Sequence, residues 1–138
     1  MRSFFDTNVL AYMFDRDAPA KRSRARELFQ AEALAGRAIV SAQVLQEFYV
    51  IVTRKFARPL EEQAAAGVAT GLASLPVIAN DAALVCKGIA RSRCMRLSFR
   101  DAMIIEAALS GGAKTLFTED LQHDQVIDGM RLHNPFMT

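Results

Sequence analysis

Short apolar runs alternate along this chain with longer segments whose apolar residues recur every three or four positions. A short apolar run bounded by turn residues is typical of a buried strand, and the longer spacing is typical of an amphipathic helix. The expected strands cover residues 3–5, 38–40, 76–78, 114–117 and 130–133. The expected helices cover residues 8–14, 20–35, 41–56, 59–75, 80–94 and 98–110.

The order of these elements predicts the fold class. Strands that alternate with helices are typical of an α/β protein in which a parallel sheet lies between two helical layers. Phe4 and Phe5 are consecutive, which indicates a first strand covered on both faces, as in such a sheet. We therefore expect residues 1–138 to form one domain, a three-layer α/β/α sandwich.

A single carboxylate, Asp6, follows the first strand at the point where the chain turns into a helix. Open α/β sheets place their ligand crevice at the carboxyl ends of the strands, which makes Asp6 a candidate site residue. Thr7 or Asn8 can cap the helix, because their side-chain oxygens accept hydrogen bonds from unpaired backbone N–H groups. The alternative is that Asp6 is itself only a helix cap, and the sequence leaves both interpretations open.

Three further acidic residues fall where the same edge of a parallel sheet would collect them. Glu47 lies in the helix after the second strand, Asp101 lies in the first turn of the last helix, and Asp120 follows the fourth strand. Each has a simpler interpretation: Asp101 completes a capping box with Ser98, Asp120 is a turn residue, and Glu47 is a solvated helix charge. Glu47 fits its simpler interpretation least well, because a carboxylate beside an apolar stripe needs a partner or a cation.

Four carboxylates within a few ångströms of one another repel strongly unless a cation lies between them. Ligation by oxygen alone selects hard ions, of which Mg²⁺ or Mn²⁺ is the usual occupant. A divalent ion suits phosphoryl chemistry, because it lowers the pKa of a bound water, orients that water and neutralises charge on the leaving oxygen. The four acids together therefore indicate a metal-dependent site for a phosphate ester.

The overall composition narrows the class of protein further. The net charge is only +2, which argues against a general polycation, although thirteen arginines against four lysines mildly favour a phosphate-bearing partner. A GC-rich genome would produce the same bias. The chain contains no apolar run of the ~18 to 20 residues that a membrane span needs, and its start lacks the apolar core of a signal peptide, so we expect a cytoplasmic protein.

Four segments carry a resemblance to a known family: FFDTNVL, LQEFY, LSFRDAMIIEAAL and LFTEDLQHDQVIDGMRLHNPF. Each contains one of the four acids, and they follow one another in order on an alternating α/β chain. Together they resemble the PIN domain, and more narrowly the VapC ribonuclease toxins of bacterial toxin–antitoxin pairs. The resemblance runs from Ser3 to Phe136.

The resemblance implies a mostly parallel five-stranded sheet between helices, cleavage of RNA with Mg²⁺ or Mn²⁺, a homodimer, and an antitoxin protein as partner. Position by position, Asp6, Glu47 and Asp101 match the three acidic metal ligands of the family, which are also its catalytic residues. Asp120 matches a fourth, more variable acid, although the adjacent Glu119 could take that place. The supporting residues implied by the match are Thr7, Asn8 and Thr118.

Basic residues and histidines offer weaker signals. Arg100 directly precedes Asp101, and with Arg91, Arg93 and Arg96 it could offset the acidic pocket toward an RNA backbone; the alternative is a solvated helix face. The two histidines, His123 and His133, are expected to be core or surface residues. His123 could instead touch substrate, because it lies near the fourth acid.

The chain departs from the family pattern at Asp124, where relatives often have glycine, so the geometry of that loop is open.

Two other classes of protein gather acidic residues at strand ends. A haloacid dehalogenase-like phosphatase needs a second Asp two residues after the first, where this chain has Asn8. A receiver-like regulatory domain needs paired acids at the first strand and a lysine after the last major strand; the chain has Phe4–Phe5 and residues 118–120 there instead.

Overall fold

The computed structural model describes residues 1–137 of the chain. The strands are β1 (Arg2–Phe5), β2 (Ala38–Ser41), β3 (Val77–Ile78), β4 (Ala113–Phe117), β5 (Val126–Ile127) and β6 (Met130–His133). The helices are α1 (Thr7–Tyr12), α2 (Pro19–Leu34), α3 (Ala42–Val50), η1 (Ile51–Lys55), α4 (Glu62–Leu72), α5 (Ala82–Met95) and α6 (Phe99–Ser110).

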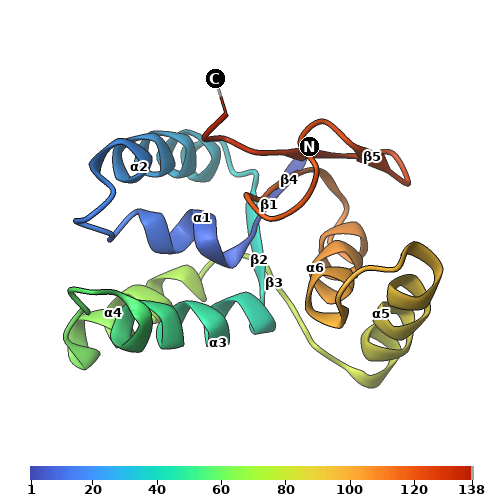
Figure 1. Cartoon of the computed structure of the whole chain (residues 1–138), viewed down its shortest axis with the longest axis horizontal. Coiled ribbons are helices and arrows are strands. Elements are labelled where there is room, and N and C mark those ends of the chain that lie inside the picture. The colour runs from blue at the N-terminus through green and yellow to red at the C-terminus, as the bar shows by residue number, and fades with distance from the viewer. Residues whose placement is uncertain (138) are drawn as a thin grey trace.

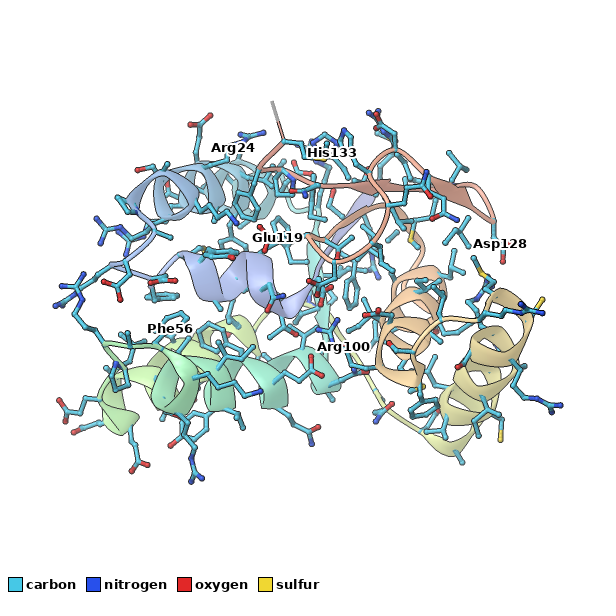
Figure 2. All side chains as sticks on the ribbon, viewed as in Figure 1. Arg24, Phe56, Arg100, Glu119, Asp128 and His133 are labelled. Carbon is cyan, nitrogen blue, oxygen red and sulfur yellow. The ribbon has the colours of Figure 1, made fainter. Side chains whose placement is uncertain are left out.

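The strands form one six-stranded sheet in the order β3-β2-β1-β4-β6-β5. All neighbouring strands are parallel except β5, which pairs with β6 in the antiparallel sense. Helices α1 to α4 lie to one side of the sheet and α5 and α6 to the other (Figure 1), and side chains fill the space between the layers (Figure 2). The predicted α/β class with a mostly parallel sheet is confirmed.

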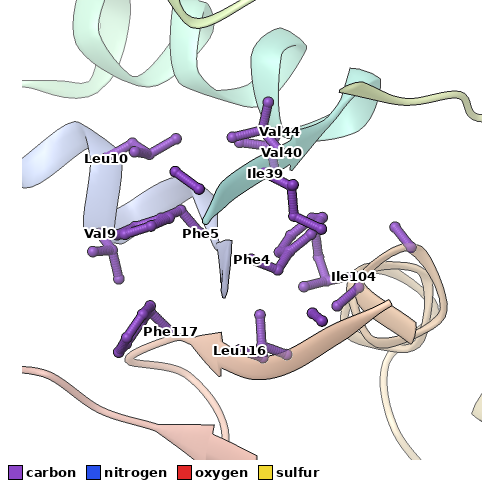
Figure 3. Close-up of a cluster of buried hydrophobic side chains, with 14 of the residues drawn as sticks. Phe4, Phe5, Val9, Leu10, Ile39, Val40, Val44, Ile104, Leu116 and Phe117 are labelled. Atoms are coloured by element: carbon purple, nitrogen blue, oxygen red, sulfur yellow. The ribbon is translucent and has the colours of Figure 1, made fainter. Parts of the chain in front are cut away.

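The core forms on both faces of β1, as the consecutive phenylalanines predict. Phe4 and Phe5 are both fully buried. Figure 3 shows Phe4 on the side of Ile104 in α6 and Phe5 on the side of Val9 in α1. The Phe5 ring also packs edge-on against Phe29 of α2, with the ring centroids 5.3 Å apart. Burial of these rings fixes β1 in the centre of the sheet, where each aromatic side chain contributes a large apolar surface.

The sheet has six strands, so the expected count of five is wrong. The additional strand β5 is only two residues long, and the turn that joins it to β6 contains Asp128 and Gly129 with φ angles of 49° and 85°. Two successive residues of positive φ match the type I′ hairpin turn, which favours Asp-Gly. The hairpin therefore rests on a local turn signal and not on a long apolar run.

The helix expected at 41–56 is interrupted. After α3 the chain widens into the π-helical segment η1, in which the N–H of Phe56 donates to the carbonyl of Ile51. The next helix, expected from residue 59, begins at Glu62, because the N–H of Leu60 donates to the carbonyl of Val52 at 2.8 Å and keeps that segment out of the helix.

The strand order places the expected ligand region at the carboxyl edge of the sheet, and we call this region the crevice. From β1 the chain crosses to β2 on one side, whereas β4 pairs with β1 on the other side. Such a switch in strand order leaves an opening between the two strand ends, where α/β sheets bind ligands. Asp6 follows β1 and Thr118 follows β4, so both face this opening. Within residues 1–137, no helix is both long enough and apolar enough to cross a membrane.

Candidate active site

Asp6 is the most buried of the four acids, and its side chain is only 1% exposed. It caps α1 by accepting a hydrogen bond from the N–H of Thr7 at 2.7 Å. Its other oxygen accepts from the hydroxyl of Thr118 at 2.8 Å, and its own N–H donates to the carbonyl of Phe117. The two interpretations of Asp6 are therefore compatible, because one oxygen caps the helix while the carboxylate faces the crevice.

Glu47 reaches the same crevice from α3. Its Oε1 accepts from the hydroxyl of Thr7 at 2.7 Å, so Thr7 links Asp6 and Glu47 through its backbone and its side chain. The amide of Gln43, one turn earlier on α3, donates to Oε2 at 3.3 Å. Glu47 is therefore a held side chain and not a solvated helix charge.

Asp101 and Asp120 complete the group from two further segments. Ser98 caps α6 by accepting from the N–H of Asp101 at 3.1 Å, which places Asp101 in the first helical turn. Asp120 lies on the loop after β4, where its N–H donates to the hydroxyl of Thr118 and its carboxylate accepts from the amide of Asn8 at 3.1 Å. All four acids thus meet at one edge of the sheet, although they span more than a hundred positions of sequence.

Arg100 lies at the centre of the four acids. Its Nη2 donates to Asp6 Oδ1 at 2.7 Å and to Glu47 Oε1 at 2.8 Å, and its Nη1 donates to Asp101 Oδ1 at 3.1 Å. Nη1 also lies 3.7 Å from Asp120 Oδ2. Figure 2 shows Arg100 between α3 and α6, facing the middle of the molecule. A single guanidinium therefore contacts every acid of the group.

The charges shift one another's pKa in directions that follow from this geometry. Burial alone would raise the pKa of Glu47, but hydrogen bonds from Arg100 and Thr7 outweigh it and lower the pKa. Burial, followed by the charge of Asp6, raises the pKa of Asp120 despite the nearby Arg100. The pKa of Arg100 is raised, because its hydrogen bonds with Glu47 and the charge of Asp6 outweigh burial. Asp120 therefore binds a proton more readily than an ordinary aspartate does.

The adjacent Glu119 points away from the crevice. Its carboxylate accepts from the hydroxyl of Tyr12 at 2.9 Å and forms an ion pair with Lys21 of α2. The structure thus places Asp120, and not Glu119, with the other acids. Neither Tyr12 nor Lys21 stood out in the sequence, because a pairing between a strand end and a distant helix leaves no local signal.

The other arginines before Asp101 lie outside the crevice. Arg91 pairs with Glu106 at 2.5 Å and with Asp128 at 2.7 Å, on the far side of α6 from the acids. Among residues 1–137, neither Arg93 nor Arg96 forms a side-chain contact with the four acids. Of the four arginines, only Arg100 therefore offsets the charge of the pocket.

A second group of possible metal ligands consists of His123, Asp124 and His133, whose ligand atoms lie within 4.8 Å of one another. Nδ1 of His123 accepts a hydrogen bond from the N–H of Asn134 at 3.0 Å, so the neutral ring carries its proton on Nε2. The carboxylate of Asp124 is already paired with Arg131. These contacts hold a loop together and leave no free nitrogen on His123 for a metal.

The same loop answers the open question at Asp124. Asp124 adopts a φ of +67°, a left-handed conformation that glycine adopts freely and that Asp tolerates better than most residues. The backbone geometry expected for glycine is therefore kept here with an aspartate.

The donor set of the crevice fits a hard divalent cation. Its acids offer carboxylate oxygens alone, and no sulfur or imidazole lies among them. Oxygen ligands and an acidic pocket are what Mg²⁺ and Mn²⁺ prefer in proteins. Asp120 is the most exposed of the four acids and Asp6 the least exposed.

Comparison with solved structures places this fold beside three toxin–antitoxin proteins. A toxin–antitoxin complex from Klebsiella pneumoniae has a TM-score of 0.70 at 20% identity, covering 99% of both chains. VapC20 of Mycobacterium tuberculosis, a toxin that cleaves the sarcin–ricin loop, has a TM-score of 0.66 at 21% identity over 86% of this chain and 89% of that one. VapBC2 of Rickettsia felis, bound to a DNA fragment of its promoter, has a TM-score of 0.64 at 19% identity over 97% and 98%.

At these identities the solved structures establish a shared fold. No curated protein matches the chain. The family model of the PIN domain matches residues 3–128, a stretch that contains all four acids and both strand ends of the crevice. The chain therefore belongs to the PIN domain family.

Proposed function

We propose that this protein is a Mg²⁺- or Mn²⁺-dependent endoribonuclease and the toxin of a toxin–antitoxin pair. The observation that carries the proposal is the convergence of Asp6, Glu47, Asp101 and Asp120 on one guanidinium at the switch point of the sheet. Four carboxylates that converge on one point repel one another unless a positive group lies among them, so their convergence indicates a site for a cation, a place that Arg100 fills here. Membership of the PIN family and the likeness to VapC20, which cleaves an RNA loop, support RNA as the substrate.

Each side chain of the proposed site has its own role. Asp6, held by Thr7 and Thr118, is the fixed ligand at the floor, and Glu47 and Asp101 approach it from α3 and α6. Asn8 orients Asp120 at the rim through its amide. When bound, the divalent ion would supply a water of lowered pKa and would offset the negative charge of the scissile phosphate. Fixed ligands matter because small displacements of reacting groups cost large factors in rate.

The alternative enzyme class fits the geometry less well. A haloacid dehalogenase-like phosphatase needs a second acid two residues after Asp6, but that position is occupied by Asn8, whose amide nitrogen donates to Asp120. A receiver-like domain needs a lysine after the last major strand, where Thr118 binds Asp6 instead. Both positions are engaged in holding the acids together, which favours the nuclease.

The proposal is tested by RNA cleavage and by growth on induced expression. Asp6→Asn and Asp101→Asn keep the shape and remove the charge, and we expect each to lower cleavage by about 10² or more. Asp120→Asn should lower cleavage less, and Glu119→Gln is the matched control, because the adjacent acid points away from the crevice. Wild type should stop growth and lose activity in EDTA. Growth unaffected by wild type, or cleavage by Asp6→Asn at the wild-type rate, contradicts the proposal.

Two protein partners follow from the same proposal. An antitoxin is supported by the toxin–antitoxin complexes among the similar structures. We further propose a homodimer, supported by the large exposed apolar side chains of Val50 and Phe99. Light scattering of the purified protein measures its mass in solution and so tests the homodimer directly.

A further inference from the structure

Arg100 occupies the place where the four acids converge. Its two terminal nitrogens form five contacts of 3.7 Å or less with the acids, and Nε adds a sixth, 3.2 Å from Glu47 Oε2. A guanidinium suits this role, because its planar fork can engage several carboxylates at once. The positive charge of Arg100 thus offsets part of the negative charge of the four carboxylates.

The guanidinium and a divalent ion cannot share this space. Nη2 lies 2.7 Å from Asp6 Oδ1 and 2.8 Å from Glu47 Oε1, so this nitrogen stands between the two carboxylates. A Mg²⁺ ion lies about 2.0 to 2.1 Å from each ligand oxygen, so an ion bound to both carboxylates would need the space between them that Nη2 fills. Two positive groups so close would also repel each other. An ion that binds Asp6 and Glu47 together must therefore displace Arg100.

The surroundings allow such a displacement. The side chain of Arg100 is 32% exposed, so it has an open path to solvent, whereas Asp6 beneath it is 1% exposed. The backbone need not move, because Ser98 caps α6 through the N–H of Asp101 and fixes this turn. The amide of Gln43 also lies 3.5 Å from the carbonyl of Arg100. Only the long side chain has to rotate.

We propose that Arg100 is an internal competitor of the metal: it holds the acids together in the metal-free protein and must leave for the ion to bind. This inference rests on the metal site of the proposed function. The apparent dissociation constant of the ion is then its intrinsic value divided by the fraction of molecules in which Arg100 has left the pocket. Arg100 thereby sets the concentration of divalent ion at which the protein becomes loaded.

The test measures Mn²⁺ binding by calorimetry, without RNA. Arg100→Met removes the charge and keeps an unbranched side chain, and we expect it to bind Mn²⁺ at least about tenfold more tightly than wild type. Arg100→Lys keeps one positive charge but loses the fork, and should fall between the two. Arg93→Met is the matched control, since Arg93 is exposed on α5 away from the acids, and should bind like wild type.

Thermal unfolding supplies a second readout that does not depend on activity. In EDTA, Arg100→Met should unfold at a lower temperature than wild type, because the four carboxylates lose the cation that contacts all of them. Saturating Mn²⁺ should then raise its unfolding temperature by more than it raises that of wild type. Arg100→Lys serves here as well, so that the comparison remains if Arg100→Met does not fold.

The outcomes separate this inference from the proposed function. Equal Mn²⁺ affinity in wild type, Arg100→Met and Arg100→Lys overturns the competition and leaves the metal site standing. Weaker Mn²⁺ binding in both Arg100 variants also overturns it, since Arg100 would then support the ion. Absence of Mn²⁺ binding in wild type and in every Arg100 variant overturns both the competition and the metal-dependent nuclease.

Discussion

At the scale of single residues, the site depends on how Asp6 is held. Its two oxygens receive hydrogen bonds from a backbone N–H, a hydroxyl and a guanidinium, and its burial makes every one of these donors matter. A buried carboxylate without donors carries a large desolvation cost. The hydroxyl among these donors belongs to Thr118. The same hydroxyl also accepts a hydrogen bond from the N–H of Asp120.

Thr118→Val replaces this hydroxyl by a methyl group of similar size. We expect the free energy of unfolding to fall by about 1 to 3 kcal/mol, because Asp6 loses one donor inside the protein and the N–H of Asp120 loses its acceptor. Thr118→Ser keeps the hydroxyl and should lose much less. Urea denaturation of the three proteins measures the effect, and a Val variant as stable as wild type would mean that this hydrogen bond is unimportant.

Single residues also show how far the sequence could predict the site. Asp6, Asp101 and Asp120 could be identified because each follows a strand or begins a helix, and those positions share one edge of a parallel sheet. Glu47 could be identified because a carboxylate beside an apolar stripe needs a partner or a cation. The central position of Arg100 could not be identified, because a residue beside Asp101 may point to solvent or to the pocket. Only the packing of α6 against the sheet decides between these directions. Similarly, the choice between Asp120 and Glu119 depends on Tyr12 and Lys21, which lie far away in sequence.

At the scale of elements, hydrogen bonds and ion pairs between helices and strands add to the apolar core. The buried Glu32 near the end of α2 accepts from the hydroxyl of Ser3 in β1 at 2.6 Å and forms an ion pair with Arg37 just before β2. These contacts join one helix to the starts of two central strands. The hydrogen bond from Arg37 outweighs burial and, with that from Ser3, lowers the pKa of Glu32.

The lowered pKa of Glu32 predicts a dependence of stability on pH. The folded protein binds the proton less readily than the unfolded chain, so Glu32 stabilises the fold fully above its ordinary pKa of about 4.5 and less as pH falls through the lowered value. Glu32→Gln should therefore cost about 1 to 3 kcal/mol at pH 7 and less below pH 4.5. Glu27→Gln, at a side chain 78% exposed, is the control. A cost for Glu32→Gln that is unchanged down to about pH 3 would contradict this assignment.

Elements marked by an apolar run or a helix cap matched their expected positions, whereas β5 and η1 were not expected. Strand β1 and helix α6 lie within one or two residues of expectation, because apolar runs and a Ser98 cap mark them. Strand β5 has only two residues and no apolar run, although the Asp-Gly pair at 128–129 is a hairpin signal that could have revealed it. The π-helical turn η1 depends on tertiary contacts such as that between Leu60 and Val52.

At the scale of the whole molecule, the strand order brings the acids together. Because β1 lies between β2 and β4, the loops that follow these strands meet above the centre of the sheet. Alternating strands and helices predicted this class of sheet, but the order of the strands was not predicted, because it depends on packing between distant segments. We propose that this arrangement of acids hydrolyses RNA with a metal-activated water.

The identity of the attacking oxygen tests that claim most directly. We would cleave RNA in water enriched in ¹⁸O with Mg²⁺ present and determine the ends of the products by mass spectrometry. Attack by water puts one solvent oxygen on the product phosphate and forms no cyclic phosphate, and EDTA should stop the reaction. Products that end in a 2′,3′-cyclic phosphate would show attack by the RNA's own 2′-hydroxyl and would contradict the mechanism built on Asp6, Glu47 and Asp101.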